Sequence, residues 1–114
     1  MANIGNVGMI DFVFHKETDS TINGAELSVQ AGYNTVNLEI SGTATNFTAI
    51  VEGRATDNGE FYPIQVANLS TLELGSEITE KGLYQMDLSA LIKCRIRVTS
   101  IASGNLSVFG RVVS

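Results

Sequence analysis

The chain lacks several residue types on which whole classes of protein depend. Its 114 residues include one cysteine, one histidine, one proline and no tryptophan. A single cysteine excludes a disulfide within the chain and a zinc site made of thiolates. No apolar run approaches the roughly 20 residues of a membrane helix, and the opening residues lack the basic and apolar regions of a signal peptide. We therefore expect a protein without membrane segments that is synthesised in a cytoplasm.

Basic residues are also scarce. Seven lysines and arginines face twelve aspartates and glutamates, which gives a formal net charge of -5. Proteins that bind nucleic acid normally concentrate a basic patch, and no stretch of this sequence does so. An anionic membrane surface would repel the chain for the same reason. The charge balance thus predicts neither a nucleic acid nor a membrane as a partner.

A nucleophile and a base for catalysis are hard to find. Such catalysis needs a base within hydrogen-bond reach of the nucleophile. The one histidine, His15, lies in a polar stretch and is expected to be exposed. Cys94 has the inward parity of a strand and is expected to be a buried structural residue, as free cysteines commonly are. The alternative is a Cys94–His15 dyad, which requires the first strand to end beside Cys94.

Acidic residues cluster only in predicted turns. Asp57 and Glu60 flank one tight loop, and Glu77 and Glu80 share another. Glycosidases need two carboxylates at a defined separation, but in turns such residues mostly interact with water and the local backbone. The loop at 56–60 has oxygen ligands for calcium without the spacing of a known calcium loop, and no phosphate-binding glycine motif occurs. We therefore expect no enzymatic activity, no cofactor and no metal.

Alternation of apolar and polar residues is the strongest positive signal, and it is clearest in residues 82–114. A period of two puts each apolar set on one face of a sheet. The three sets are Tyr84, Met86 and Leu88; Cys94, Ile96 and Val98; and Leu106, Val108 and Val112. They predict three successive strands that supply much of the core.

Further strand patterns precede these three, at residues 9–14, 25–29, 35–41, 47–55 and 60–68, with a weaker one at 69–74. Turn signals recur roughly every 8 to 12 residues, as in a sandwich or barrel. The alternation favours antiparallel pairing with one face in water. The prediction is one all-β domain over residues 1–114, a jelly-roll-like antiparallel β-sandwich of about eight or nine short strands. Residues 1–8, approximately, are expected to form a flexible arm.

Individual residues add local expectations. Gly53, inside a strand pattern, predicts a bulge or a close neighbour. Pro63 has no amide hydrogen, so its strand should lie at an edge or contain a bulge. The polar stretch 15–24 ends in Asn-Gly, which predicts a turn, and residues 56–59 predict a hairpin loop.

Arg95 and Arg97 share the outward face of one predicted strand. Glu39 and Glu52 are outward candidates on other strands, and opposite charges on neighbouring strands would pair across the sheet. The first hypothesis is therefore a ladder of charges within one chain. The alternative is a contact between subunits, in which the arginines meet carboxylates of a second copy.

From Tyr33 onward the order of motifs matches a recurrent pattern. A strand ending in Glu52-Gly53 is followed by a turn at 57–59 and then by aromatic residues. Further matches are Gly82, Tyr84, Asp87, Ser89, Leu91, Arg95, Arg97, Val98, Thr99, Ser103, Gly104, Val108 and Gly110. Over about residues 33–114 the chain thus resembles the small β-sandwich modules of tailed-bacteriophage and prophage virion proteins, found in tails, baseplates, fibres and head decorations. It departs from the pattern at Arg54, where a small residue is usual, and at Phe61-Tyr62, where tryptophan is common.

This resemblance implies a non-enzymatic structural protein of the virion, made in the cytoplasm of a bacterial host. Virion proteins act in many copies, so we expect self-association, with a trimer or hexamer suiting the symmetry of a particle. Docking on other virion proteins is expected as well. The candidate interaction residues are Arg95, Arg97, Arg54, Phe61 and Tyr62.

The alternative function is a carbohydrate-binding β-sandwich that recognises a host-surface glycan. Exposed aromatic platforms usually carry such binding, and the candidates are Tyr33, Phe61, Tyr62 and Phe109. Three of the four also suit a place in the core, and tryptophan is absent, so this function is less favoured. A hydrolase on a sandwich scaffold is the third possibility and lacks a constellation of base and nucleophile.

Overall fold

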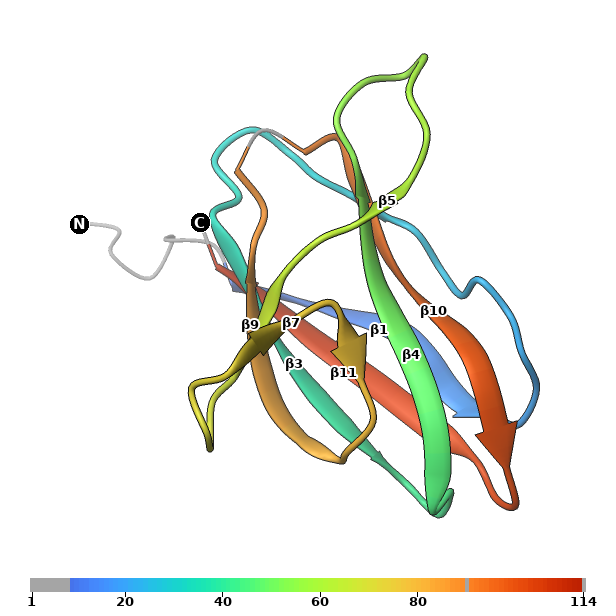
Figure 1. The fold of residues 1–114 in the computed structure, drawn as a ribbon. Helices are drawn as coiled ribbons and strands as arrows, with labels where there is room; N and C mark the ends of the chain where they lie inside the picture. The colour runs from blue at the N-terminus through green and yellow to red at the C-terminus, as the bar shows by residue number, and fades with distance from the viewer. Residues whose placement is uncertain (1–8, 90, 114) are drawn as a thin grey trace.

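The computed structural model describes residues 9–89 and 91–113, which form two antiparallel sheets facing each other (Figure 1). The expected arm at residues 1–8 lies outside the described residues. None of the described residues belongs to a helix long and apolar enough to cross a bilayer. The predicted all-β sandwich is therefore confirmed.

The strand order is that of a jelly roll. One sheet runs β1 (Met9–Thr18), β11 (Leu106–Val113), β3 (Thr35–Gly42), β9 (Gly82–Asp87), β6 (Val66–Asn68), β7 (Leu74–Gly75). The other runs β2 (Leu27–Ser28), β10 (Lys93–Ala102), β4 (Asn46–Arg54), β5 (Tyr62–Pro63), and β8 (Glu77–Ile78) also pairs with β4. Because β11 inserts between β1 and β3, and β10 between β2 and β4, the chain winds as a jelly roll.

The core lies between the sheets and follows the predicted parity. All nine apolar residues picked out in the stretch 82–114 are at most 5% exposed. From β3, the side chains of Val36, Leu38 and Ile40 join them at 2% exposure or less. Burial of each such side chain stabilises the fold by about 1.5–3 kcal/mol. The last third of the chain thus supplies central strands to both sheets. In one sheet β9 and β11 flank β3, and in the other sheet β10 lies between β2 and β4.

Residues 60–68 do not form the single predicted strand. Pro63 lies in β5, at the edge of its sheet as expected, and the amide of Ile64 still donates to the carbonyl of Val51 at 2.9 Å. The chain then crosses to the other sheet and begins β6 at Val66. The period of two continued through this crossing, so the sequence alone did not reveal it. The predicted polar loop at 75–81 likewise contains β8, whose Ile78 is fully buried.

The first strand is longer than predicted, because β1 continues from Phe14 to Thr18. Its pairing with β11 shifts register after Val13 and again after His15, so the strand bends. The predicted end of the strand at residue 14 is therefore wrong, since the polar stretch 15–24 begins as strand. Gly24, in its last position, does adopt a positive φ of 79°.

Gly53 has a close neighbour, as the sequence predicted. A Cβ atom at this position would lie 2.9 Å from Cδ1 of Leu91. The pairing of β4 with β10 runs without a register shift through Gly53. The glycine therefore lets residues after β9 pack against the inner side of β4.

Candidate functional site

The outer face of the β2-β10-β4-β5 sheet carries most of the sequence-predicted site residues. β10 and β4 pair antiparallel, with Arg95 opposite Glu52 and Lys93 opposite Arg54. The inward positions of β10 hold Cys94, Ile96 and Val98, so its charged residues must point outward. We call this surface the charged face; its members are Glu26, Glu52, Arg54, Phe61, Lys93, Arg95 and Arg97.

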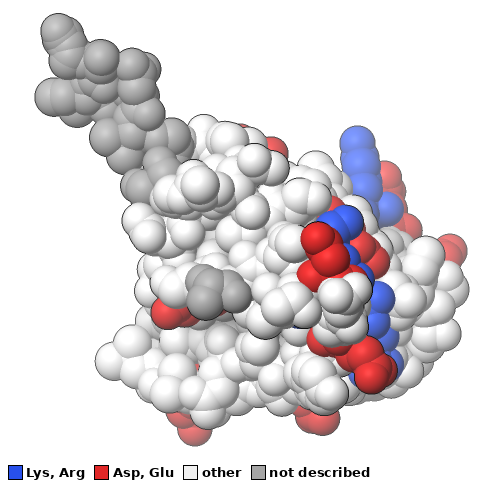
Figure 2. Space-filling model, turned by 90° about the horizontal axis from the view of Figure 1, so that it is seen from above, with Lys and Arg blue, Asp and Glu red and all other residues white. Residues whose placement is uncertain are grey.

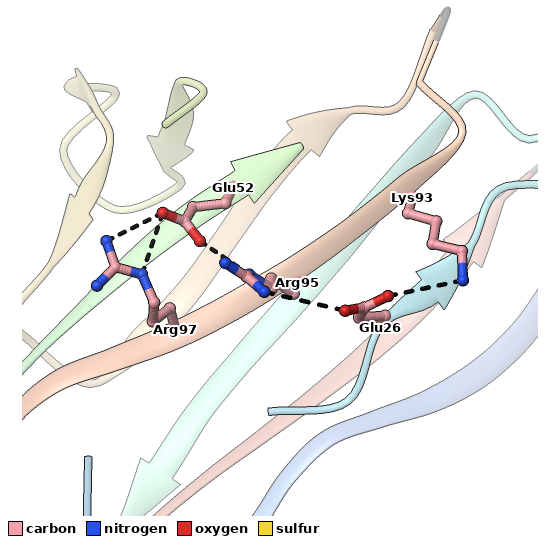
Figure 3. Close-up of polar contacts among 5 residues, drawn as sticks. All are labelled: Glu26, Glu52, Lys93, Arg95 and Arg97. Carbon is pink, nitrogen blue, oxygen red and sulfur yellow. Dashed lines mark hydrogen bonds and ion pairs between the residues drawn. The ribbon is translucent and has the colours of Figure 1, made fainter. Parts of the chain in front are cut away.

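Glu52 is the centre of the charged face (Figure 3). Nε of Arg95 donates to Oε1 of Glu52 at 2.9 Å, and Nε of Arg97 donates to Oε2 at 3.1 Å. The Glu52 side chain is only 6% exposed, whereas those of Arg95 and Arg97 are 16% and 36% exposed. A carboxylate buried this far needs both partners to offset the loss of water.

The pKa of Glu52 lies below its ordinary value. Burial acts to raise it, but the hydrogen bonds from Arg97 and Arg95 and the charges of both arginines together lower it. Glu52 is therefore ionised at neutral pH. Each arginine donates through Nε to this carboxylate.

A second carboxylate extends the network along β10. Glu26 lies 3.6 Å from Nζ of Lys93 and 3.9 Å from an Nη atom of Arg95. Figure 3 shows Arg95 between Glu52 and Glu26. Sequence reasoning missed Glu26, although its place beside inward Leu27 in a short strand pattern was a usable signal.

An aromatic ring closes the other side of the charged face. The guanidinium carbon of Arg95 lies 3.9 Å from the ring centroid of Phe61, and that of Arg54 lies 5.4 Å from it. Both distances suit cation–π attraction. Nε of Arg54 is buried and has no hydrogen-bond partner among the described residues. The two positions at which the chain departs from the phage-module pattern thus contact each other.

Tyr62 lies in the edge strand β5 of the same sheet and is 64% exposed. It pairs with Gly53, which has the inward parity of β4, so the register directs its side chain away from the arginines. The structure therefore gathers Arg54, Phe61, Arg95 and Arg97 on one face, with Tyr62 at the edge of that sheet. In the view of Figure 2, basic and acidic side chains lie next to one another in a band on an otherwise mostly uncharged surface.

Glu39 does not join this network. It lies in β3, in the opposite sheet, where it pairs with Phe109 and Leu83. Of the two predicted carboxylate partners only Glu52 neighbours the arginines. Strand parity placed both glutamates outward but could not say to which sheet the strand of each belongs.

The predicted exposure of His15 is wrong. The register shifts in β1 turn its side chain inward, and the residue is only 4% exposed. Its Nε2 donates to the carbonyl of Ile96, and Nδ1 lies 2.9 Å from Oγ1 of Thr18. Burial holds the pKa of His15 below its usual value, although the bond to Ile96 opposes this shift. No signal in the sequence revealed the bulge.

Cys94 is buried as predicted. It is fully inaccessible, and burial raises the pKa of its thiol to about 12. The thiolate needed for nucleophilic attack is therefore not formed near neutral pH. Nε2 of His15 contacts the carbonyl of Ile96 and Nδ1 contacts the hydroxyl of Thr18, so neither ring nitrogen is directed at the thiol.

The acidic loop at 56–60 shows turn geometry, whereas Glu77 lies in β8. The amide of Gly59 donates to the carbonyl of Thr56 at 3.1 Å, which closes the hairpin loop between β4 and β5. Within residues 9–89 and 91–113, no three or more histidine, cysteine or acidic side chains converge in a way that suits a metal ion. The charged face is thus built from ion pairs and one aromatic ring, Phe61.

Comparison with known proteins identifies the family. The family model described as XepA matches residues 8–112. The chain belongs to the XepA family. This match includes β1 and β2, which the motif resemblance had left out, and it confirms the relationship to prophage proteins. No curated protein matches the chain significantly.

Two solved structures share the XepA-family fold. The SPBc2 prophage-derived protein YomS is 27% identical with a TM-score of 0.86, over 94% of each chain. The PBSX exported protein XepA is 29% identical with a TM-score of 0.89, over 94% of this chain. The matched region is 38% of that XepA chain. The same fold therefore makes up nearly all of one prophage protein and a part of another.

Proposed function

We propose that this XepA-family chain is a non-enzymatic structural subunit of a phage or prophage particle, which self-associates and docks on other particle proteins. The observation that carries the proposal is the match to two prophage proteins over 94% of this chain. The geometry supports it, since the chain offers a folded surface of ion pairs and aromatic rings while its cysteine is buried. Particles of this kind are assembled in the host cytoplasm.

Co-sedimentation with particles tests this function. Phage particles are induced from a host that carries the gene and purified on a density gradient, and the chain is detected with an antibody. We expect it to band with the particles at a fixed ratio to a major head or tail protein. If the chain occurs only in the particle-free fraction, the virion assignment is wrong. A free protein in the medium would instead match the word "exported" in the name of XepA.

The charged face is the proposed docking surface for other particle proteins. Tyrosine and arginine are enriched among the residues that dominate binding energies, and Tyr62 is 64% exposed in the edge strand β5, which borders the charged face. Tyr62→Ala should leave the fold intact and lower incorporation into particles at least about tenfold. Leu74→Ala is the matched control, because Leu74 is 65% exposed on a different sheet. Equal incorporation of both variants would exclude Tyr62 from the contact.

Binding of a host-surface glycan is the second candidate. It is favoured by the exposure of Tyr62, since a ring that stands in water can stack on a sugar. A glycan array probed with the purified chain and with Tyr62→Ala tests it. Hits that disappear in the variant support glycan binding, and an array without hits removes it.

A further inference from the structure

The outer face of the six-stranded sheet carries an open groove. It has a volume of about 580 Å³ and crosses β1, β11, β3 and β9, which lie side by side in that order (Figure 1). Each sheet turns its inner side to the shared core, so the groove lies on the opposite side of the molecule from the charged face. Ligand sites commonly have volumes of about 300–1,000 Å³ and combine an apolar lining with a few polar groups. The groove therefore has the size of a binding site, and its lining decides the class of ligand.

One row of side chains across the groove is mostly apolar. Strand pairing sets four residues next to one another, in the order Val13, Phe109, Glu39 and Leu83. Three of them are apolar and yet 38–52% exposed, because they take the outward parity of their strands. Phe109 is one of the aromatic platforms predicted from the sequence. The row thus offers an aromatic ring flanked by aliphatic groups, all of them open to water.

The adjacent row is polar on all four strands. In the same order of strands it consists of Asp11, Arg111, Asn37 and Gln85. Nε and an Nη atom of Arg111 donate to the two carboxylate oxygens of Asp11, at 2.7 Å and 3.1 Å. Nε2 of Gln85 donates to Oδ1 of Asn37 at 2.9 Å. Two hydrogen-bonded pairs therefore order the polar row before a ligand binds, which lowers the entropic cost of binding.

The polar row retains donors and acceptors that a ligand can use. A guanidinium has five N–H groups, and Arg111 uses two of them on Asp11. The bond between Gln85 and Asn37 takes one donor hydrogen and one acceptor oxygen. It leaves the Nδ2 group of Asn37 as a donor and the Oε1 atom of Gln85 as an acceptor. Groups of both kinds thus stand beside the apolar row.

An oligosaccharide matches the two rows. A sugar ring has a face of C–H groups, which can stack on an aromatic ring, and a rim of hydroxyls, each of which donates and accepts hydrogen bonds. Neighbouring strands lie about 4.8 Å apart, so the four side chains of a row span about 14 Å. This span is longer than one sugar ring, which favours a chain of sugars lying across the strands.

The charge of the groove favours a neutral ligand. Asp11 and Arg111 balance each other, and Glu39 forms no ion pair with the described lysines and arginines. The net charge of -5 on the whole chain repels anions further. The lining therefore suits a neutral saccharide better than a phosphate, a nucleotide or an acidic sugar.

We propose that the groove binds a neutral oligosaccharide, with one sugar ring over Phe109 and its hydroxyls bonded to Arg111, Asn37 and Gln85. This inference rests on the second candidate function, glycan binding, and moves its site from Tyr62 to the outer face of the opposite sheet. It does not depend on a role in the particle. Because the two aromatic residues lie on different sheets, each can be changed without disturbing the other.

Phe109→Ala tests the stacking contact. The purified chain is screened on an oligosaccharide array, and the neutral oligosaccharide with the strongest signal is titrated by calorimetry. Phe109→Ala should raise its Kd at least about tenfold. Tyr62→Ala, which removes an exposed ring from the other sheet, is the matched control and should leave the Kd unchanged. Circular dichroism verifies that both variants fold. An effect of Tyr62→Ala alone would overturn the groove as the site and leave glycan binding standing.

Gln85→Ala tests the polar row. The loss of about one hydrogen bond should raise the Kd of the same oligosaccharide roughly two- to tenfold. Gln30→Ala is the control, because Gln30 is an exposed glutamine outside the groove. Equal affinities of the two variants would contradict the proposed contact between the hydroxyls and the polar row.

Glu39→Gln tests the preference for a neutral ligand. The native chain should bind neutral members of the array more tightly than carboxylated or phosphorylated ones, and the variant should narrow this difference. A native chain that prefers anionic glycans would overturn the assigned class of ligand, and an array without hits would overturn the whole proposal. Neither result affects the role in a particle, which co-sedimentation tests separately.

Discussion

Glu52 and His15 are the two buried groups whose ionisation affects the fold most directly. Glu52 is a carboxylate held by two arginines, and His15 is an imidazole held between a carbonyl and a hydroxyl. With Nε2 donating to Ile96, Nδ1 of the neutral ring accepts from the hydroxyl of Thr18. Glu52 stabilises the jelly roll at neutral pH as an anion, and His15 does so as an uncharged ring.

Glu52→Ala should lower the free energy of unfolding by about 2–3 kcal/mol, because two guanidinium groups would lose their shared counter-charge. The cost should stay below that of a fully buried pair, since the Arg97 side chain is 36% exposed. Chemical denaturation measures it. Asp11→Ala is the control. It removes the ion pair with Arg111, whose two side chains are more than half exposed, so it should change stability little. Equal effects of the two variants would contradict the role of burial.

Stability should fall as the pH drops below the ordinary pKa of histidine. The folded-state pKa of His15 is lowered from 6.5, so the unfolded chain binds a proton more readily between these two values. The contribution is complete above pH 6.5 and is lost as pH falls through the folded pKa. His15→Gln retains a donor of similar reach for the carbonyl of Ile96 and removes the titration. Between pH 5 and 8, the free energy of unfolding of the native chain should rise with pH, and this slope should be absent from His15→Gln.

Among the elements, β11 is the most tightly surrounded strand. It lies between β1 and β3, with Gly110 opposite Phe12 on one side and Leu38 on the other. A Cβ atom at Gly110 would lie 2.8 Å from Cε2 of Phe14 and 3.0 Å from Cγ2 of Val36. The glycine therefore allows the bent half of β1 to pack its aromatic ring over the core.

Gly110→Ala should destabilise the fold by about 1–3 kcal/mol, because Phe14 or the strand must shift. Gly75→Ala is the control, since a Cβ atom added at Gly75 would have no other atom within 4 Å. This control should change stability by less than about 0.5 kcal/mol. Thermal and urea unfolding of both variants measure the difference, and an unaffected Gly110→Ala would show that the contact relaxes without cost.

On the scale of the whole molecule, the two sheets share one core. β1 to β4 alternate between the sheets, and the last three strands return to the centre of both. Neither sheet can separate without exposing residues of the other, since the buried apolar residues of both sheets form one cluster. From chain connectivity and burial we expect the described residues to behave as a single cooperative unit.

Unfolding should therefore be a single transition. Urea curves followed by far-ultraviolet circular dichroism and by tyrosine fluorescence should coincide, as in two-state unfolding of small domains. Tyr84 is 5% exposed in one sheet and reports on the core, whereas the dichroism reports on both sheets. Transitions at different urea concentrations would show that one sheet opens first.

The sequence by itself determined the class of fold and the inward residues of the longest strands. Period-two alternation depends only on the pleat of a strand and on the hydrophobic effect, so it predicted Met86, Ile96 and Val108 as core residues correctly. It also placed Arg95 and Arg97 outward and Pro63 at an edge, since each of these follows from one residue's own chemistry. The motif pattern was enough to indicate phage and prophage relatives.

Only the tertiary structure decided which strands are neighbours. Parity says on which side of a strand a residue lies but not which sheet the strand joins, so Glu39 and Glu52 looked alike and only Glu52 meets the arginines. The crossing after Pro63 and the bulges that bury His15 depend on pairing with strands far away in the sequence. For the same reason the place of β1 at the end of its sheet could not be predicted from its residues, because an edge is defined by the strand order of the whole sheet.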